Sequence, residues 1–276
     1  MTDVPTIRLN NGIEIPQLGF GVFQIDPEHT VDATLAALEV GYRHIDTAQM
    51  YGNEREVGEA VRKSDLARDD VFVTSKLNND AHDPSGVPAA LDRTLEALGF
   101  DVLDLFLIHW PMPAVGDYVE TWRAMVGLLD SGRVRAVGVS NFQPEHLQRL
   151  LDADLAVRAV NQVEVHPFFR QDAVRAFDSE HGIVTEAWSP IAQGEALADP
   201  TIVEIADRTG RTPAQVTLRW HLQRGDVVFP KSVTPSRMAE NFAVFGWELT
   251  PEDMSAIDRL DREGRRGPDP DTFNRT

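Results

Sequence analysis

The chain has 276 residues, of which 44 are acidic and 26 are basic, and it contains no cysteine. The lack of cysteine excludes a disulfide framework, thiolate metal sites and a cysteine nucleophile. The formal net charge of −18 argues against nucleic acid and anionic membranes as partners, because no run of Lys and Arg offsets it.

The N-terminal segment contains Asp3 and Pro5 and has neither a basic nor an apolar region, so we expect no signal peptide. The longest apolar stretch, Val102–Trp110, is interrupted by Asp104 and His109. It is far shorter than the ~20 residues of a membrane helix. The sequence therefore predicts a soluble, cytoplasmic protein.

A short hairpin is predicted ahead of the main fold. Two alternating runs within Thr6–Ile15 flank Asn10-Asn11-Gly12. An Asn-Gly pair suits the positive φ values of a type I′ turn, which is a common connection between two antiparallel strands.

The rest of the chain alternates between apolar runs and longer amphipathic stretches, mostly about 30 residues apart, which is the length of a βα unit. The apolar runs are Gln17–Gly21, Tyr42–Asp46, Val71–Lys76, Leu103–His109, Val134–Val139, Val160–Glu164, Val184–Ala187 and Val227–Phe229. Helical patterns between them include Val31–Val40, Asp117–Leu129 and Ala214–Leu222.

This alternation runs through an undivided chain and predicts an α/β fold, a closed (β/α)8 TIM barrel with an N-terminal β-hairpin and a short C-terminal tail. We expect residues 1–276 to form one domain. The alternative is a doubly wound open sheet, which would normally carry a glycine fingerprint after its first strand. The segment Gly19–Gln24 lacks the third glycine of that motif.

The chemistry of such barrels lies at the carboxyl ends of the strands, where this chain places Asp46, Tyr51, Lys76 and His109. A lysine ammonium at ~4 Å would favour tyrosinate by ~4 kcal/mol before burial opposes it. A nearby Asp46 would keep Lys76 charged, and a neutral His109 would hold a carbonyl oxygen in line with the Tyr51 hydroxyl. The set lacks a nucleophile and suits proton delivery to an oxygen while another group supplies hydride.

Several motifs in register connect the chain to a known family. They are Gly41–Ala48, Tyr51-Gly52-Asn53-Glu54, Lys76, His109-Trp110-Pro111, Gly138–Phe142, Asn161-Gln162 and Pro230–Val233. With these motifs the chain resembles the aldo-keto reductases, particularly the bacterial branch that includes 2,5-diketo-gluconic acid reductases. The resemblance covers nearly the whole chain.

The resemblance implies a barrel that binds NADPH in an extended pose and transfers hydride to an aldehyde or ketone, such as an α-dicarbonyl or a keto sugar. It implies that Tyr51 is the proton donor, that Lys76 and Asp46 tune it, and that His109 orients the carbonyl.

The resemblance also implies contacts along the cofactor. Trp188 would stack on the nicotinamide, whose carboxamide would be held by Ser140, Asn141 and Gln162. Further contacts fall on Ser189, Phe229 and Ile191, the last near the pyrophosphate. The adenosine end would meet Lys231, Ser232, Val233, Arg237, Glu240 and Asn241. A lysine plus an arginine there suits a 2′-phosphate and favours NADPH over NADH. For Val233 and Glu240, packing and capping remain open alternatives.

The expected substrate walls are Phe23 and Trp110, beside His109. Many relatives carry a tryptophan at position 78, where this chain has Asn78, so the pocket should be wider or more polar on that side. The tail from Gly264 to Thr276 is shorter than in animal relatives, which predicts an incomplete lid.

Two other functions remain open. A non-catalytic NADPH-binding regulatory or structural protein is possible, because fold alone does not determine activity. A metal-dependent barrel hydrolase would use His109, His166 and Asp46, although His166 before Pro167 is more typical of a structural role and no HExxH-like spacing is present. We expect no metal, and we expect a monomer.

Overall fold

The computed structural model describes residues 4–155 and 159–275. Its main sheet has eight parallel strands in the order β3 to β10. They are β3 (Phe20–Gly21), β4 (His44–Asp46), β5 (Phe72–Leu77), β6 (Leu103–Ile108), β7 (Val134–Ser140), β8 (Val160–Glu164), β9 (Val184–Trp188) and β10 (Val227–Val228). A parallel bridge between Leu18 and Val228 joins the first and last strands. The predicted barrel is confirmed.

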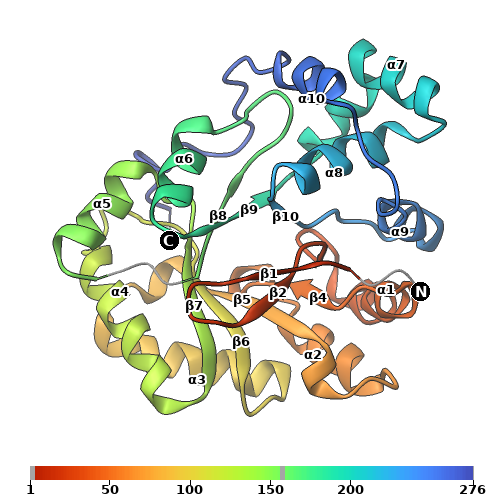
Figure 1. Ribbon diagram of the computed structural model, residues 1–276. Coiled ribbons are helices and arrows are strands. Elements are labelled where there is room, and N and C mark those ends of the chain that lie inside the picture. The colour runs from red at the N-terminus through yellow and green to blue at the C-terminus, as the bar shows by residue number, and fades with distance from the viewer. Residues whose placement is uncertain (1–3, 156–158, 276) are drawn as a thin grey trace.

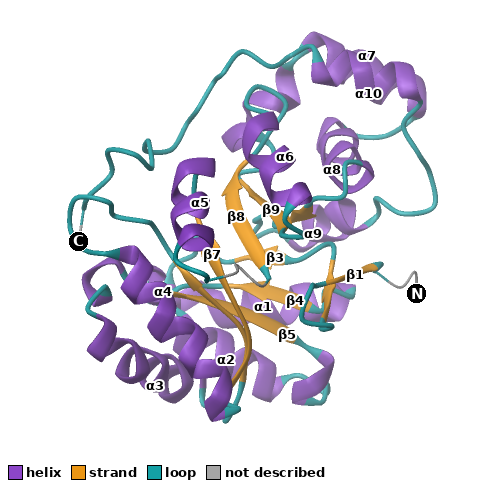
Figure 2. Ribbon diagram, turned by 60° about the vertical axis from the view of Figure 1, so that its left-hand side comes forward, coloured by secondary structure: helices purple, strands orange, loops and turns teal. Residues whose placement is uncertain are grey.

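Helices surround this sheet, as Figures 1 and 2 show. They are α1 (Pro27–Val40), α2 (Glu54–Lys63), α3 (Val87–Leu98), α4 (Tyr118–Gly127), α5 (Pro144–Asp152), α6 (Asp172–Glu180), α7 (Pro200–Thr209), α8 (Pro213–Gln223), α9 (Pro235–Phe242) and α10 (Pro251–Asp258). Short 3-10 helices lie between them: η1 (Gln49–Tyr51), η2 (Arg68–Asp70), η3 (Asn79–Ala81), η4 (Pro84–Gly86), η5 (Leu128–Ser131) and η6 (Ala192–Ala198). No helix in the described part of the chain is long and apolar enough to cross a membrane.

Most element boundaries lie within one or two residues of the predicted ones, and two differences are larger. The runs Gln17–Gly21 and Val227–Phe229 contribute only short strands, because Leu18 pairs with Val228 as an isolated bridge rather than as part of a longer ladder. Helix α1 begins at Pro27, four residues before the predicted start, since proline is well suited to the first turn of a helix.

The predicted hairpin is present as β1 (Thr6–Arg8) and β2 (Glu14–Pro16), with Ile7 opposite Ile15. Its turn is not the expected type I′, because Gly12 has a φ of 90° and Asn11 is not among the residues with positive φ. The Gly12 N–H donates to Leu9 O at 2.9 Å. A three-residue loop with glycine in the left-handed region fits this pattern.

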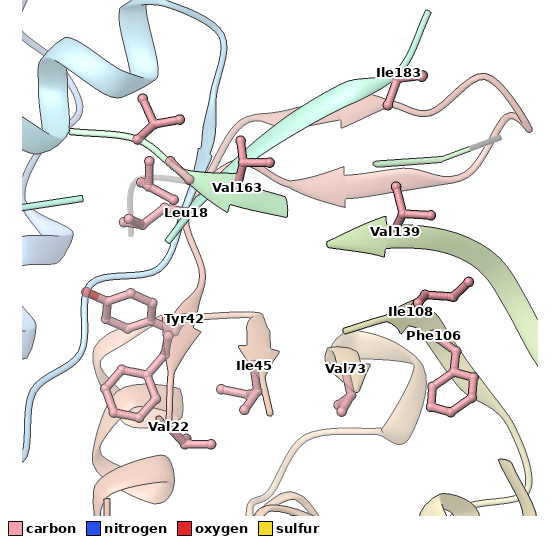
Figure 3. Packing of buried hydrophobic residues seen from close by; sticks show 14 of the residues in the cluster. Leu18, Val22, Tyr42, Ile45, Val73, Phe106, Ile108, Val139, Val163 and Ile183 are labelled. Atoms are coloured by element: carbon pink, nitrogen blue, oxygen red, sulfur yellow. The ribbon is translucent and has the colours of Figure 1, made fainter. Parts of the chain in front are cut away.

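Two apolar cores arise from the alternation of side chains along the strands. On β6, Leu105 and Leu107 belong to a barrel-interior cluster that also contains Leu9 and Ile15 from the hairpin. Phe106 and Ile108 belong instead to the larger cluster that includes residues of the surrounding helices, and Figure 3 shows part of that packing. The hairpin thus helps to fill one end of the barrel, and the polar strand ends lie at the other.

After α10 the chain continues as a long tail with little regular structure, visible in Figure 2 as a loop that runs back towards α5. Arg262 and Gly264 donate backbone hydrogen bonds to Phe168 O, at 3.2 and 2.8 Å. Near its end, Asp271 lies 3.5 Å from His146 of α5. The tail therefore crosses from α10 to the opposite side of the barrel. At the other end of the chain, residues 1–3, on which part of the signal-peptide expectation depends, lie outside the described residues.

Candidate active site

A buried ion pair lies at the carboxyl ends of β4 and β5. Lys76 Nζ is 2.8 and 2.9 Å from the two carboxylate oxygens of Asp46, and it donates to Thr47 O at 2.9 Å. Burial by itself lowers the pKa of Lys76, but Asp46 and Tyr51 more than offset that effect and leave the pKa raised. Lys76 is therefore a fixed cation inside the barrel.

Tyr51 ends η1, and Gly52 follows it in the left-handed conformation with a φ of 69°. Lys76 Nζ lies 4.9 Å from the centre of the Tyr51 ring. Burial raises the pKa of Tyr51 more than the Lys76 charge lowers it, so the pKa stays above the ordinary value of 10.0. The Lys76 charge favours tyrosinate, as expected, but desolvation outweighs the cation and the net shift is upward.

His109 follows β6 and is buried, with its ring centre 5.8 Å from that of Tyr51. Burial, followed by the nearby Lys76 charge, holds the pKa of His109 well below 6.5. The imidazole is therefore neutral at pH 7 and retains one N–H donor. Its Nδ1 is buried and has no hydrogen-bond partner among the described residues.

The loop that carries Tyr51 is fixed by Asn53. Its side-chain nitrogen donates to Val22 O and Ile25 O at 3.0 and 3.2 Å, and its oxygen accepts from Thr47 Oγ1 at 2.8 Å. The next residue, Glu54, is buried and accepts from Ser75 Oγ at 2.5 Å, directly before Lys76. These contacts tie the β3, β4 and β5 ends together, so Tyr51 sits on a rigid support.

The residues expected at the nicotinamide form one hydrogen-bonded group. Asn141, at a φ of 65°, donates to His109 O at 2.9 Å and to Ser140 Oγ at 3.1 Å. Its oxygen accepts from Trp188 Nε1 at 2.9 Å, which orients the indole. Gln162 donates to Asp46 at 2.9 Å and so connects this group to the ion pair.

The segment after Trp188 has unusual backbone geometry. Ser189, Ala192 and Gln193 have φ values of 52°, 50° and 56°, followed by Gly194 at 98°. Non-glycine residues rarely adopt such values, and they cluster at ligand-binding segments when they occur. Ser189 and Ile191, both half-buried, lie in this strained stretch.

The predicted adenosine contacts lie in the segment after β10 and on α9. Lys231, Val233 and Arg237 are exposed, and Val233 keeps 55% of its surface accessible. Ser232 is buried, and its hydroxyl accepts from Thr234 N at 3.1 Å at the start of α9. Asn241 is buried on the same helix.

Two expected cofactor residues make structural contacts. Glu240 accepts from Thr212 Oγ1 at 2.8 Å, so its side chain links α9 to the start of α8, in line with the capping alternative. Phe229 is 6% exposed and packs inside the barrel, with its ring centre 4.8 Å from that of His44. The Phe229 side chain therefore contributes to the interior core.

The expected substrate walls gather beside Tyr51 and His109. Phe23 is 54% exposed, with its ring centre 5.0 Å from that of Tyr51. Trp110 is buried and packs against Phe273 of the tail at 4.4 Å between ring centres. The backbone N–H of half-buried Asn78 donates to Gln49 Oε1 at 2.9 Å.

The short tail, expected to form an incomplete lid, is attached at several points near these walls. Asn79 donates to Arg275 O at 2.9 Å, and Asn274 accepts from Ala114 N at 2.9 Å. With the Trp110–Phe273 contact, these bonds hold the end of the tail against the β5 and β6 loops. The tail is therefore part of the wall despite its length.

Sequence reasoning missed two buried carboxylates. Glu186 on β9 is fully buried and accepts from Gln162 at 2.8 Å. Glu164 at the end of β8 accepts from the tail backbone at Arg266 and Gly267, at 2.6 and 2.8 Å. The sequence offered one indication of these residues, which is an acidic residue within an otherwise apolar strand run. Because a buried carboxylate is costly without hydrogen-bond partners, such a residue indicates a polar site inside the barrel.

The hydrolase alternative requires a cluster of His109, His166 and Asp46. His166 Nε2 lies 2.9 Å from Glu164 Oε1, and both side chains are buried. Within residues 4–155 and 159–275, no group of three or more His, Cys, Asp or Glu side chains has the arrangement of a metal site. His166 thus contributes to the tail anchor at Glu164.

Known proteins are similar to this chain in sequence and in fold. The model of the Aldo/keto reductase family matches residues 17–262. An aldo-keto reductase of Mycolicibacterium smegmatis is 50% identical over 272 residues, covering 99% of each chain. The methylglyoxal reductase DkgA of Salmonella typhimurium is 47% identical over 275 residues, again covering 99% of both. A variant of Gox0644, solved in complex with NADPH, has a TM-score of 0.95 at 46% identity, with 99% of both chains covered. The chain therefore belongs to the aldo/keto reductase family.

Proposed function

We propose that this aldo/keto reductase uses NADPH to reduce aldehyde and ketone carbonyls, including α-dicarbonyls and keto sugars, with Tyr51 as the proton donor. The observation that carries the proposal is the buried Lys76–Asp46 pair beside Tyr51 and a neutral His109. Burying an ion pair costs desolvation free energy that its attraction need not repay, so its presence here points to a role beyond stability. Its location beside an acidic hydroxyl suits proton transfer.

Each side chain has a distinct part in this chemistry. Tyr51 stays protonated at neutral pH because its pKa lies above 10.0, so its hydroxyl can donate to a carbonyl oxygen that gains negative charge. The Lys76 ammonium stabilises the resulting phenolate, and Asp46 keeps that ammonium in position. The neutral His109 donates an N–H to the same oxygen and aligns the carbonyl.

The residues present fit a nicotinamide cofactor, which when bound supplies the hydride. Trp188 offers a flat ring whose N–H is tied to Asn141. The strained Ser189–Gly194 segment and the exposed Lys231 and Arg237 suit the phosphates of an extended dinucleotide. The similarity to a Gox0644 variant in complex with NADPH supports the same choice of cofactor.

We propose small carbonyl compounds as substrates. Phe23 offers an apolar contact beside Tyr51, and the Trp110–Phe273 pair offers another next to His109 in the chain. Half-buried Asn78 offers a polar side chain after β5. The similarity to methylglyoxal reductases of Salmonella typhimurium and Escherichia coli supports small α-dicarbonyls as the first class to test.

The direct test follows NADPH oxidation with a panel of aldehydes, α-diketones and keto sugars. Tyr51→Phe should abolish turnover, by about two orders of magnitude or more, and leave NADPH binding nearly intact. Loss of binding in this variant would assign Tyr51 a structural role. A folded wild-type protein that binds NADPH tightly and turns over none of the panel would support the regulatory or structural alternative instead.

We also propose that residues 1–276 act as one domain, as a monomer in the cytoplasm, where NADPH is available. Among the described residues, the large apolar side chains that are exposed are Phe23, Met50, Val115 and Val233. Phe23 and Val233 already have roles in the proposed site, so no broad apolar face is left for a subunit contact. Gel filtration with light scattering and cell fractionation test these points.

A further inference from the structure

We propose that Glu186 is a positioning residue that orients the side-chain amide of Gln162, so that the Gln162 carbonyl oxygen faces the nicotinamide carboxamide. The inference rests on the proposed function, because it assumes a nicotinamide beside Gln162. It goes further by giving a role to a residue outside the predicted site.

The contact between these residues is set by strand register. Gln162 of β8 pairs directly with Glu186 of β9, so both side chains point into the barrel at the same level. Gln162 Nε2 donates to Glu186 Oε2 at 2.8 Å and to Asp46 Oδ2 at 2.9 Å. Both hydrogens of the amide nitrogen are therefore used.

This arrangement fixes the rotation of the amide. If the amide turned by 180°, its oxygen would face the Asp46 carboxylate, which only accepts hydrogen bonds and is the partner of Lys76. The side-chain amide of Gln162 makes its hydrogen bonds through Nε2. Its Oε1 makes none with the residues that the structure describes, 4–155 and 159–275. Gln162 Oε1 is left to accept from an incoming N–H, which is what a carboxamide offers.

A glutamate at position 186 lowers the stability of the folded protein, because its carboxyl group is fully buried inside the barrel. Inward-facing barrel positions are usually filled by branched apolar side chains, and a carboxyl group there loses its hydration. Burial, followed by the Asp46 charge, raises the pKa of Glu186 to about 8. Its Oε1 is buried and has no partner among the described residues. A buried polar atom of this kind costs stability, and the bond to Gln162 and the nearby Lys76 charge offset part of that cost.

Glu186 is not a second partner for the lysine. The Lys76 ammonium already has its acceptors, the two Asp46 oxygens and Thr47 O. Among the described residues, the hydrogen bond that Glu186 makes towards the cofactor site is the one to Gln162.

The test compares two cofactors that differ at the carboxamide. NADP+ carries the carboxamide NH2, and its acetylpyridine analogue carries a methyl group in its place. Titration calorimetry gives the dissociation constant of each, and their ratio reports how well the protein recognises the NH2 donor. This readout needs no turnover, and a general loss of stability would weaken both ligands equally.

Four proteins should be compared: wild type, Glu186→Leu, Glu186→Gln and Thr185→Val. Thr185→Val is a matched control, because Thr185 is the preceding β9 residue and bonds Asp178 on the other face of the strand. We expect the wild type to prefer NADP+ and Glu186→Leu to lose roughly three- to tenfold of that preference, the effect of one hydrogen bond. Glu186→Gln should retain the preference, since its carbonyl oxygen can still accept from Gln162.

The outcomes separate the two proposals. If Glu186→Leu keeps the wild-type ratio, or if the wild type shows no preference, the role of Glu186 is overturned and NADPH-dependent reduction stands. If the wild type binds neither ligand, both proposals are overturned. Should Glu186→Leu fail to fold, Glu186→Met provides the same test with a more adaptable side chain.

Discussion

The two ends of the proposed cofactor site are built in contrasting ways. The inner cluster, which we define as Asp46, Lys76, Gln162 and Glu186, is buried, and each member bonds another. The outer patch, defined as Lys231, Val233 and Arg237, is exposed. Neither charge of the Lys76–Asp46 pair can be removed without leaving the other buried and unpaired. A charge in the outer patch is solvated before and after binding.

This contrast separates residues that contribute to the free energy of folding from residues that contribute to the free energy of cofactor binding. The inner cluster contributes to folding and to the alignment of reacting groups, and its interactions are coupled. The outer patch contributes affinity through separate charges that salt screens. Substitutions in the two places should therefore differ in size, in additivity and in their response to salt.

The largest effect is expected for Lys76→Met, which leaves Asp46 buried without its cation. We expect the free energy of unfolding to fall by about 3–5 kcal/mol and turnover to be lost. Urea denaturation and NADPH oxidation measure both. The control is the double variant Lys76→Met/Asp46→Asn, which should recover part of the stability because no charge remains unpaired. A single variant as stable as the wild type would contradict the coupled picture.

A smaller effect is expected for Glu186→Gln on the pH dependence of stability. The pKa of Glu186 is about 8 in the folded protein against 4.5 ordinarily, so the folded state holds this proton more tightly. Its contribution is present below about pH 4.5 and is lost as the pH rises towards 8.

The wild type should therefore lose stability between pH 5 and 8.5 more steeply than Glu186→Gln, by roughly 1–4 kcal/mol. The pKa of Asp178 is raised to about 7, so its titration changes the stability of both proteins by the same amount. This contribution cancels in the comparison. Denaturation curves at several pH values provide the measurement, and parallel slopes would show that Glu186 does not titrate in this range.

Gly267→Ala probes the tail that lies against the inner end of the site. A Cβ on Gly267 would collide with the Trp188 ring and approach Glu164 Oε2 at 3.1 Å. We expect NADP+ affinity to fall about three- to tenfold and stability by about 1 kcal/mol, since an overpacked contact must shift. Gly264→Ala in the same tail meets Phe168 instead and should spare NADP+ binding. Equal effects of both variants would argue against a specific link to Trp188.

The smallest effects are expected in the outer patch. Lys231→Ala and Arg237→Ala should each weaken NADPH about three- to tenfold and leave NADH nearly unchanged. Raising salt should weaken NADPH more than NADH in the wild type. Lys63→Ala, which removes an exposed cation of α2 paired with Glu59, should change neither. Equal salt sensitivity for the two cofactors would remove the case for a 2′-phosphate site.

Much of the molecule follows from the sequence because its signals are local. Strand and helix periodicity is repeated along the chain, so eight strand runs predict a barrel even where β3 and β10 are shorter than their runs. Polar residues at the strand ends likewise indicate the site, since parallel strands of a barrel share one mouth. The motif around Tyr51 and Lys76 then identifies the chemistry by resemblance.

What the sequence did not determine depends on distances between segments. The pKa of Tyr51 is a balance between burial and the Lys76 charge, and neither can be evaluated before the barrel is closed. The bond from Gln162 to Glu186 exists because of the β8–β9 register. At Gly267 the tail meets Glu164, which is 103 residues earlier in the chain, and Trp188, which is 79 residues earlier. Desolvation and long-range contacts are properties of the packed structure, so only the tertiary fold decided how this site is tuned and held.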